Sequence, residues 1–268
     1  MYPILFSLKN FKIHTYGFFV ALAFTISFLY LYYSIKKIKK KIISYDELYH
    51  IFVYIMISGI FCARLFFIIL NLEYFILYPI DVLKIWNGGL VYYGGFVGSI
   101  IFIFIYTKSK KIDLFNLCDI FAPSLALGHA IGRIGCFFAG CCYGKATNLP
   151  WAITFTNEYS LAIKHVSVHP TQIYESIINF LLFIILHFYS NGYGYFGNNS
   201  IGSGMSVAIY LIVYGIARVV IEFFRGDTTK IYCTCFSISQ IISFFLFIFG
   251  VLIIWKRKIY IKKSRKRE

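Results

Sequence analysis

Seven long apolar stretches, each bounded by polar or charged residues, dominate the pattern of this chain. Each is close to the roughly 20 residues that an α-helix needs to cross a bilayer. The stretches lie at about 16–33, 51–70, 89–106, 114–138, 173–189, 204–223 and 238–255. We therefore predict an all-α, polytopic integral membrane protein with about seven transmembrane helices.

Composition agrees with this class, since 59% of the 268 residues are hydrophobic and 14% are charged. The net charge is +15, which by itself would also suit a nucleic-acid partner. The cations lie beside apolar stretches, however, in clusters at 36–41, 108–111 and 256–267. Basic clusters mark cytoplasmic loops and attract anionic lipid. We therefore expect membrane lipid as a partner and no nucleic acid.

The basic clusters also predict the orientation of the chain. An N-out and C-in arrangement with about seven crossings places all three clusters in the cytoplasm. We predict a single transmembrane domain over 1–268, with a small outer-face region at about 139–170 and a basic cytoplasmic tail at about 256–268. A short amphipathic segment with Asp46 and Glu47 is expected inside, before the second crossing.

Polar side chains gather at the outer ends of the predicted fourth, fifth and sixth crossings. They are Arg133, His169, Glu175, Arg218, Glu222 and Arg225. Because polar groups in hydrocarbon must be paired or hydrated, their common depth indicates one shared cavity. Arg133 stands among glycines and apolar residues, where a guanidinium needs a cavity, a partner or an anion. The alternative is a structural arginine paired with Asp119 or Glu222.

Six local motifs follow one another in an order that identifies a family. They are HTYG (14–17), GGLVYYGG (88–95), GRIGCFFAGCCYG (132–144), HPTQIYE (169–175), YGIARVVIEFFRGD (214–227) and SQII (239–242). Their order and spacing resemble the prolipoprotein diacylglyceryl transferases over nearly the whole chain. The resemblance implies transfer of a diacylglyceryl group from phosphatidylglycerol to the lipobox cysteine thiol of a prolipoprotein signal peptide. The products are a thioether and glycerol phosphate, in the first step of bacterial lipoprotein maturation.

The resemblance also implies a lipid site and a location. Arg133 matches the phosphatidylglycerol-binding arginine, with Gln172 and Tyr93 as further lipid-binding residues. A guanidinium suits phosphate oxygens and stabilises charge that grows on a leaving phosphate. The expected location is the bacterial cytoplasmic (inner) membrane, where phosphatidylglycerol and prolipoprotein signal peptides are the partners. We expect no cofactor and no metal, because the lipid carries its own leaving group.

Catalytic roles follow from the same resemblance. Arg218 and Glu222 stand at i and i+4 on one helical face and suggest a second phosphate clamp, although such a pair is also a common structural feature. Either His169 or Glu175 could be the base for the incoming thiol, with helix capping as the alternative role of His169. Tyr16 matches a position near the lipid, or is an interfacial belt residue.

Three positions depart from the common form of the family. Tyr93 stands where histidine is common, Cys136 replaces an asparagine and Cys141 replaces a glutamate. Tyr93 retains a hydroxyl donor, and thiols are weaker hydrogen-bonding groups that can ionise. A mechanism with a histidine base at position 93 is therefore in doubt.

The cysteines suggest an alternative class of function. Candidates for redox chemistry or disulfides on the outer side are Cys136, Cys141, Cys142, Cys233 and Cys235. A membrane thiol–disulfide oxidoreductase would use such pairs, although the chain has no CxxC motif. A zinc site with His129 or His165 would need a spacing that matches no standard pattern. A transporter with paired charges along its path is a third hypothesis.

Overall fold

The computed structural model describes residues 2–8, 11–36, 43–84, 88–192, 204–228 and 236–264. Within these ranges the chain is mostly helical. Its helices are α1 (Thr15–Lys36), α2 (Tyr45–Leu70), α3 (Leu72–Leu77), α4 (Tyr92–Lys110), α5 (Leu114–Ala139), α6 (Thr171–Gly192), α7 (Met205–Phe224) and α8 (Ile238–Ser264). A short 3₁₀ helix, η1, covers Pro79–Leu83. The strands are β1 (Ile4–Leu8), β2 (Phe11–His14), β3 (Ile153–Thr154) and β4 (Ser167–Val168).

The described helices belong to two compact units. Unit 1 comprises residues 1–38 and 118–268, and unit 2 comprises residues 39–117. Unit 1 therefore holds α1, nearly all of α5, and α6 to α8, whereas unit 2 holds α2, α3 and α4. The single transferase domain expected from the sequence stays a prediction.

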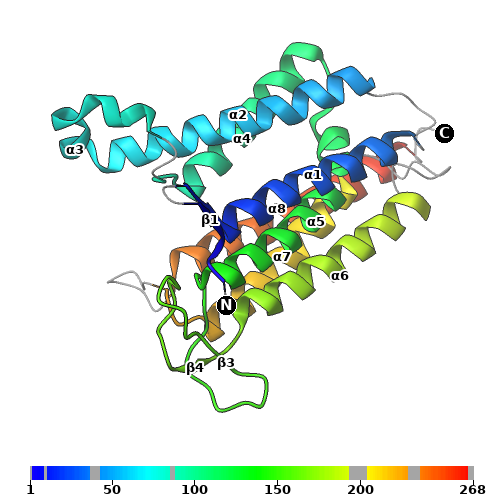
Figure 1. Ribbon diagram of the computed structural model, residues 1–268. Coiled ribbons are helices and arrows are strands. Elements are labelled where there is room, and N and C mark those ends of the chain that lie inside the picture. The colour runs from blue at the N-terminus through cyan, green and yellow to red at the C-terminus, as the bar shows by residue number, and fades with distance from the viewer. Residues whose placement is uncertain are drawn as a thin grey trace. The chain divides into compact units, whose positions relative to one another are not determined.

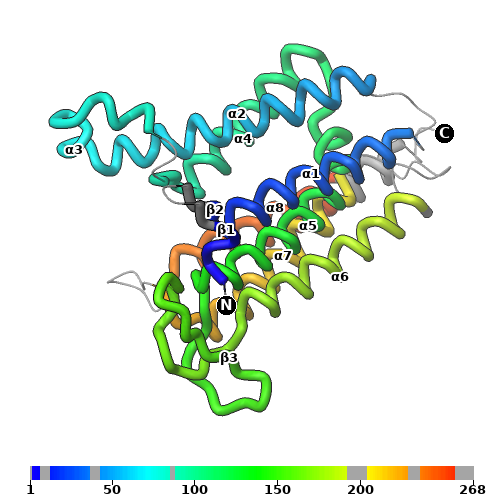
Figure 2. The backbone as a smooth tube through the Cα atoms, viewed as in Figure 1, coloured from blue at the N-terminus to red at the C-terminus, as the bar shows by residue number. Residues whose placement is uncertain are grey.

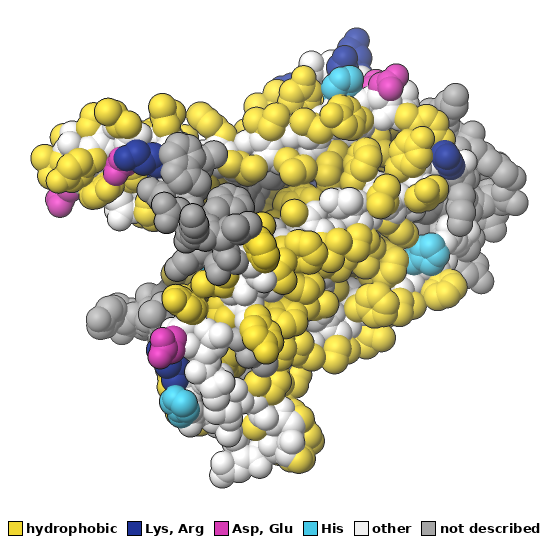
Figure 3. Space-filling model, viewed as in Figure 1, with side chains coloured by type: hydrophobic (Ala, Val, Ile, Leu, Met, Phe, Trp, Pro, Cys, Tyr) yellow, Lys and Arg dark blue, Asp and Glu magenta, His cyan; other side chains and the backbone are white. Residues whose placement is uncertain are grey.

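Six of the described helices are long and apolar enough to cross a membrane, namely α1, α2, α5, α6, α7 and α8. Hydrophobic side chains cover most of the helix surface on the face seen in Figure 3, where charged side chains are few. The chain is thus a multi-pass membrane protein. Helix α4 coincides with the predicted third crossing but is not among the six. The count of seven crossings and the N-out, C-in orientation therefore stay predictions.

The predicted apolar stretches coincide with the observed helices to within a few residues, except at the end of α8 and the start of α2. Helix α8 continues to Ser264, into the predicted basic tail, whereas α2 begins at Tyr45, before its apolar stretch. Asp46 and Glu47, which we expected in a separate short segment, form the first turn of this helix. Ser44 Oγ accepts a hydrogen bond from the Glu47 amide at 3.1 Å, and Glu47 Oε2 accepts one from the Ser44 amide at 2.9 Å. This reciprocal capping extends the helix beyond its apolar run.

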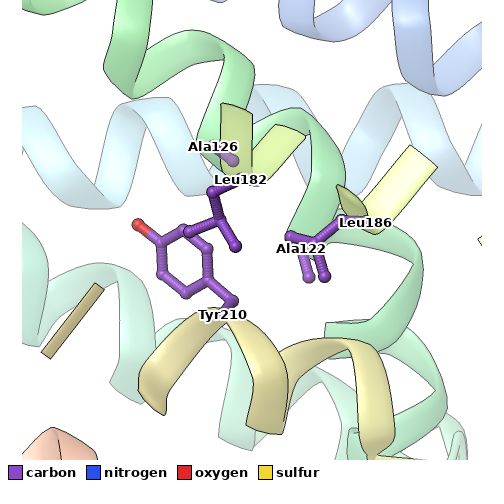
Figure 4. Close-up of a cluster of buried hydrophobic side chains, with 5 residues drawn as sticks. All are labelled: Ala122, Ala126, Leu182, Leu186 and Tyr210. Carbon is purple, nitrogen blue, oxygen red and sulfur yellow. The ribbon is translucent and has the colours of Figure 1, made fainter. Parts of the chain in front are cut away.

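Unit 1 is a helical bundle whose core lies between α5, α6 and α7. Its buried hydrophobic side chains are Ala122, Ala126, Leu182, Leu186 and Tyr210. Figure 4 shows that they converge from three separate helices, with the Tyr210 ring next to Leu182. Small residues on α5 face the larger side chains of α6 and α7, which allows the helices to pack closely.

Helix α1 approaches α5 closely because two positions on α5 have no side chain. A Cβ atom on Gly128 would lie 2.6 Å from Ser27 Oγ, and one on Gly135 would lie 2.8 Å from Phe19 Cβ. Ser27 Oγ also donates a hydrogen bond to the Ser124 carbonyl at 3.0 Å. Gly128 and Gly135 therefore serve helix packing, and they bring α1 close to α5.

The long polar connection between α5 and α6 lies at the end of this bundle, where α5 ends and α6 begins (Figures 1 and 2). It contains the antiparallel pair β3 and β4. The Lys145 amide donates to the Phe224 carbonyl at 2.8 Å, and the Gly226 amide donates to the Tyr143 carbonyl at 3.0 Å. These bonds attach the connection to the end of α7. The same end of the bundle thus gathers the termini of several helices, as the alternating topology predicts.

Unit 2 is organised around a buried arginine on α2. Arg64 Nε donates to the Val82 carbonyl at 3.1 Å, Nη1 to that of Gly88 at 2.8 Å and Nη2 to that of Asp81 at 2.6 Å. Five donors on one planar group make Arg suitable for such multiple contacts. Arg64 therefore fixes the segment that leads into α4, at whose start Tyr93 lies.

A buried carboxylate on α5 caps the start of α7. Asp119 is 3% exposed. Its Oδ2 accepts a hydrogen bond from the Gly204 amide at 2.6 Å, and its Oδ1 accepts one from the Val207 amide at 2.9 Å. A carboxylate at a helix N-terminus satisfies free amides and interacts favourably with the helix dipole. The position of Asp119 is thus structural.

We expect Asp119→Ala to lower the thermal unfolding temperature of the detergent-solubilised protein. Loss of such a cap costs about 1–2 kcal/mol, and burial of the amides places this site at the upper end. Asp113→Ala is the matched control, because Asp113 also caps a helix, through the Asn116 amide at 2.8 Å, at an exposed position. An equal loss in both variants would contradict the role of burial.

Candidate functional site

One buried carboxylate holds two arginines together at the end of the unit 1 bundle. Glu175 lies in the second turn of α6, and its side chain is 3% exposed. Its Oε1 lies 2.9 Å from Arg133 Nη2, and its Oε2 lies 3.4 Å from Arg218 Nη1. The three side chains come from α6, α5 and α7. The structure thus brings together three of the six residues that we expected at one location, and their shared cavity stays a prediction.

Arg218 is engaged on several sides. Its Nη2 lies 3.0 Å from Glu222 Oε2, one turn along α7, and 3.2 Å from Ser239 Oγ at the start of α8. Arg218 thus links three helices. Two carboxylates and two guanidinium groups balance in charge, which is how ionised groups persist in an apolar bundle.

Arg133 differs from Arg218 in how many of its donors are engaged. Its side chain is 15% exposed, against 9% for Arg218. Beyond Glu175, its Nη1 faces the Cys136 sulfur at 4.0 Å. A thiol is a weak acceptor, so this edge of the Arg133 guanidinium retains donors for an anion. Its carboxylate partner is neither Asp119 nor Glu222, the two that the structural alternative named.

His129 is part of this cluster, although sequence reasoning gave it no role there. Its Nε2 lies 3.5 Å from Glu175 Oε1 and 3.4 Å from Arg133 Nε. The ring also packs against Tyr214, with 5.1 Å between centroids. The sequence spacing could have predicted this, because His129 stands four residues before Arg133 and so shares its helix face.

The start of α6 fixes the turn that follows α5. Gln172 Nε2 donates to the Cys141 carbonyl at 2.8 Å, and Thr171 Oγ1 donates to the Cys142 carbonyl at 2.6 Å. Gln172 Oε1 is buried and has no hydrogen-bond partner among the described residues. Gln172 was predicted to bind lipid, and its amide carbonyl remains available for a polar ligand.

His169 lies at the rim and outside the arginine–glutamate contacts. Its amide donates to the Lys145 carbonyl at 3.0 Å, and its Nδ1 lies 3.3 Å from the Tyr174 hydroxyl. The ring packs against Phe224, with 5.3 Å between centroids. The described contacts of His169 thus place it between the loop and the helix ends, and a role as base stays a prediction.

The two tyrosines predicted for the site differ in what the structure says of them. Tyr16, at the start of α1, is 47% exposed and interacts electrostatically with Arg133. Tyr93, at the start of α4, is 40% exposed and packs edge-on against Tyr92. Tyr93 belongs to unit 2, so its role at a site in unit 1 stays a prediction.

Three thiols adjoin Arg133. The sulfur atoms of Cys136, Cys141 and Cys142 all lie within 4.8 Å of one another, and none forms a disulfide. The pKa of the Cys142 thiol is lowered, chiefly because the other two thiols donate hydrogen bonds to it. The positive charges of Arg133 and Arg225 act in the same direction.

Two parts of the predicted site add little to this cluster. Cys233 and Cys235 lie outside the described residues, so the predicted pairing with them is untested. Arg225 forms an ion pair with Asp227, in which Nη2 lies 2.8 Å from Oδ1. This ion pair lies at the end of the bundle, where residues that anchor a helix at the membrane interface are expected.

Comparison with known proteins agrees with the motifs. The family model described as prolipoprotein diacylglyceryl transferase matches residues 3–256. A relative from Clostridium tetani is 38% identical over 94% of this chain and 96% of its own length. One from Finegoldia magna is 33% identical over 98% and 99% of the two chains, and one from Synechocystis is 30% identical over 94% and 88%.

Each of these relatives is named phosphatidylglycerol–prolipoprotein diacylglyceryl transferase. No name among the relatives supports the thiol–disulfide oxidoreductase that the cysteines suggested. The family match covers nearly the whole chain, including every motif described above. The chain belongs to the prolipoprotein diacylglyceryl transferase family.

Proposed function

We propose that this protein transfers the diacylglyceryl group of phosphatidylglycerol to the cysteine thiol of a prolipoprotein signal peptide, in the bacterial cytoplasmic membrane. The observation that carries the proposal is the Arg133 guanidinium, which Glu175 anchors on one side and which retains donors on the other. An apolar bundle favours such a charge only where it has a partner or a ligand. The phosphate of a membrane lipid is a suitable ligand for the free edge.

The chemistry follows from where charge develops. The sulfur of the signal peptide attacks C3 of the diacylglyceryl group and forms the thioether bond. The bond between C3 and the phosphate oxygen breaks, and its electron pair leaves with glycerol phosphate, which gains negative charge. Arg133 stabilises this charge more strongly in a water-poor site than it would in water.

Arg218 supports this step by holding Glu175, and Glu222 in turn holds Arg218. Since Arg218 Nη1 and Nη2 already contact carboxylates and Ser239, its direct use as a phosphate clamp requires one of these contacts to open. We therefore assign Arg218 and Glu222 a positioning role. Glu175 orients Arg133, because its Oε1 occupies the Nη2 edge and leaves the Nη1 edge for the lipid.

The identity of the base is not fixed by these contacts. Glu175 already contacts Arg133, Arg218 and His129. His169 contacts Tyr174 and Phe224. Both remain the candidates that the sequence named. We assign Tyr16 a contact with the lipid headgroup, which its electrostatic interaction with Arg133 supports.

Arg133→Ala should reduce diacylglyceryl transfer by about 100-fold or more, since loss of one charge-stabilising donor costs about 10²–10³ in rate. Arg133→Lys should restore little, because a point charge cannot replace the planar fork. The assay is mass spectrometry of a lipobox peptide incubated with the protein and phosphatidylglycerol. Lys164→Ala, which removes an exposed cation, is the control. Transfer at the unmodified rate in Arg133→Ala would refute the assignment.

Glu175→Ala should destabilise the solubilised protein by roughly 3–5 kcal/mol, because the buried Arg133 loses its carboxylate partner and Arg218 loses one of its two. Glu175→Gln should unfold at a higher temperature than Glu175→Ala while still losing transfer, because it keeps polar contacts but not the charge. Thermal unfolding and the peptide assay measure the two effects. Glu158→Ala is the exposed control. Stability equal to that of the unmodified protein in Glu175→Ala would contradict the central role of this carboxylate.

Tyr93→Phe should slow transfer about fivefold if its hydroxyl bonds the lipid, since one hydrogen bond is worth about 1 kcal/mol. Tyr92→Phe is the matched control, because Tyr92 is the adjacent residue and is also exposed. The readout is the initial rate at saturating peptide and varied phosphatidylglycerol. Equal rates for both variants would contradict a role of the Tyr93 hydroxyl in lipid binding.

A further inference from the structure

The thiols beside Arg133 form a cluster that the transfer step described above does not use. Cys136 lies on the last turns of α5, whereas Cys141 and Cys142 lie in the turn that follows. Gly140 and Cys142 adopt positive φ values of 78° and 62°. This left-handed backbone folds the chain back over the helix end, so that the three sulfur atoms meet within 4.8 Å of one another.

Side chains at the start of α6 hold the backbone of this cluster in place. Gln172 and Thr171, at the start of α6, bond the carbonyls of Cys141 and Cys142 at 2.8 and 2.6 Å. These hydrogen bonds fix the backbone of the turn without using the sulfur atoms. Both sulfur-bearing residues of the turn are partly exposed, so the cluster can be reached from the bundle end.

Three thiolates in this arrangement suit a soft divalent cation. Zinc binds cysteine sulfur at about 2.3 Å, so three sulfurs around a tetrahedral zinc lie about 3.8 Å apart. The observed limit of 4.8 Å is close enough for small side-chain rotations to complete the set. Zinc with three thiolates carries a net charge of −1, which Arg133 can offset, since its Nη1 lies 4.0 Å from Cys136 Sγ.

We propose that Cys136, Cys141 and Cys142 bind one Zn²⁺ and that the signal-peptide thiol occupies its fourth position. Three protein ligands with one open position are the arrangement of catalytic zinc, whereas structural zinc has four protein ligands. A thiol bound to zinc is deprotonated outright. The site would therefore supply the thiolate beside Arg133. This inference rests on the proposed transfer reaction.

The step balances without an oxidant or reductant. The bound peptide thiol releases its proton to water, and its sulfur electron pair forms the bond to C3 of the diacylglyceryl group. The C3–O bond breaks, and its electron pair departs with the phosphate oxygen. The thioether is a weaker ligand than the thiolate and leaves the unchanged metal. The zinc thus performs the task for which the sequence offered His169 or Glu175.

Metal binding is tested first. The full-length protein is purified in lipid nanodiscs under reducing conditions and titrated with Co²⁺, a spectroscopic probe for zinc sites. We expect one equivalent per chain, with thiolate charge-transfer bands and the intense visible bands of tetrahedral cobalt. Cys136→Ser, Cys141→Ser or Cys142→Ser should each weaken binding at least about 100-fold, since even outer-shell changes cost about 10–100-fold. Cys118→Ser, on the same helix, should leave binding unchanged.

The open position is tested by adding peptide to the cobalt-loaded protein. A lipobox peptide with cysteine should shift the visible bands, and the same peptide with serine should not. The double variant Cys233→Ser/Cys235→Ser should retain both responses. Absence of bound cobalt, an equal response to both peptides, or loss of the metal in the double variant would overturn the proposal.

Activity separates this proposal from the proposed function. Chelation should abolish transfer, and Zn²⁺ should restore it. Full transfer by metal-free protein would overturn the zinc role and leave the transferase function intact. A peptide-responsive cobalt site in a protein that transfers no diacylglyceryl group would support the metal site and contradict the transferase function.

Discussion

The ionised Glu175 carboxylate, buried between two guanidinium groups, is the interaction on which the site depends. It joins α5, α6 and α7 through Arg133 and Arg218. Without it Arg133 would have no carboxylate partner among the described residues, and Arg218 would keep only Glu222. Breaking such a buried pair costs more than the pair itself contributes. The two arginines also differ in their surroundings. Arg218 contacts Glu175, Glu222 and Ser239. Arg133 has one edge anchored by Glu175 and another that, among the described residues, faces the weak acceptor Cys136 Sγ, which is what an anion-binding arginine requires.

The helices were predictable because transmembrane length and apolar runs determine them. The gathering of the polar residues at one bundle end was also predictable, since alternating crossings bring those helix ends together. The pairing of each arginine with its carboxylate was not predictable, because it depends on which helices are neighbours. Arg133 meets Glu175, whereas Asp119, one of its expected alternative partners, caps α7. His129 could have been found by its four-residue spacing from Arg133.

The thiol cluster could not be found from spacing. Cys136, Cys141 and Cys142 match no standard zinc pattern, and a regular helix would point them in different directions. They meet because the helix ends at Ala139 and the chain turns with positive φ at Gly140 and Cys142. Backbone conformation of this kind is decided by packing against α6, which a local sequence window does not contain. Cys136 and Cys141, two of the positions that depart from the common family form, therefore have a geometry that the sequence did not predict.

A structure of the protein in phosphatidylglycerol nanodiscs tests the central claim most directly. The account predicts a lipid phosphate within hydrogen-bond distance of Arg133 Nη1 while Nη2 keeps its contact with Glu175. A headgroup bound elsewhere, with the Nη1 edge of Arg133 facing no phosphate, would contradict it.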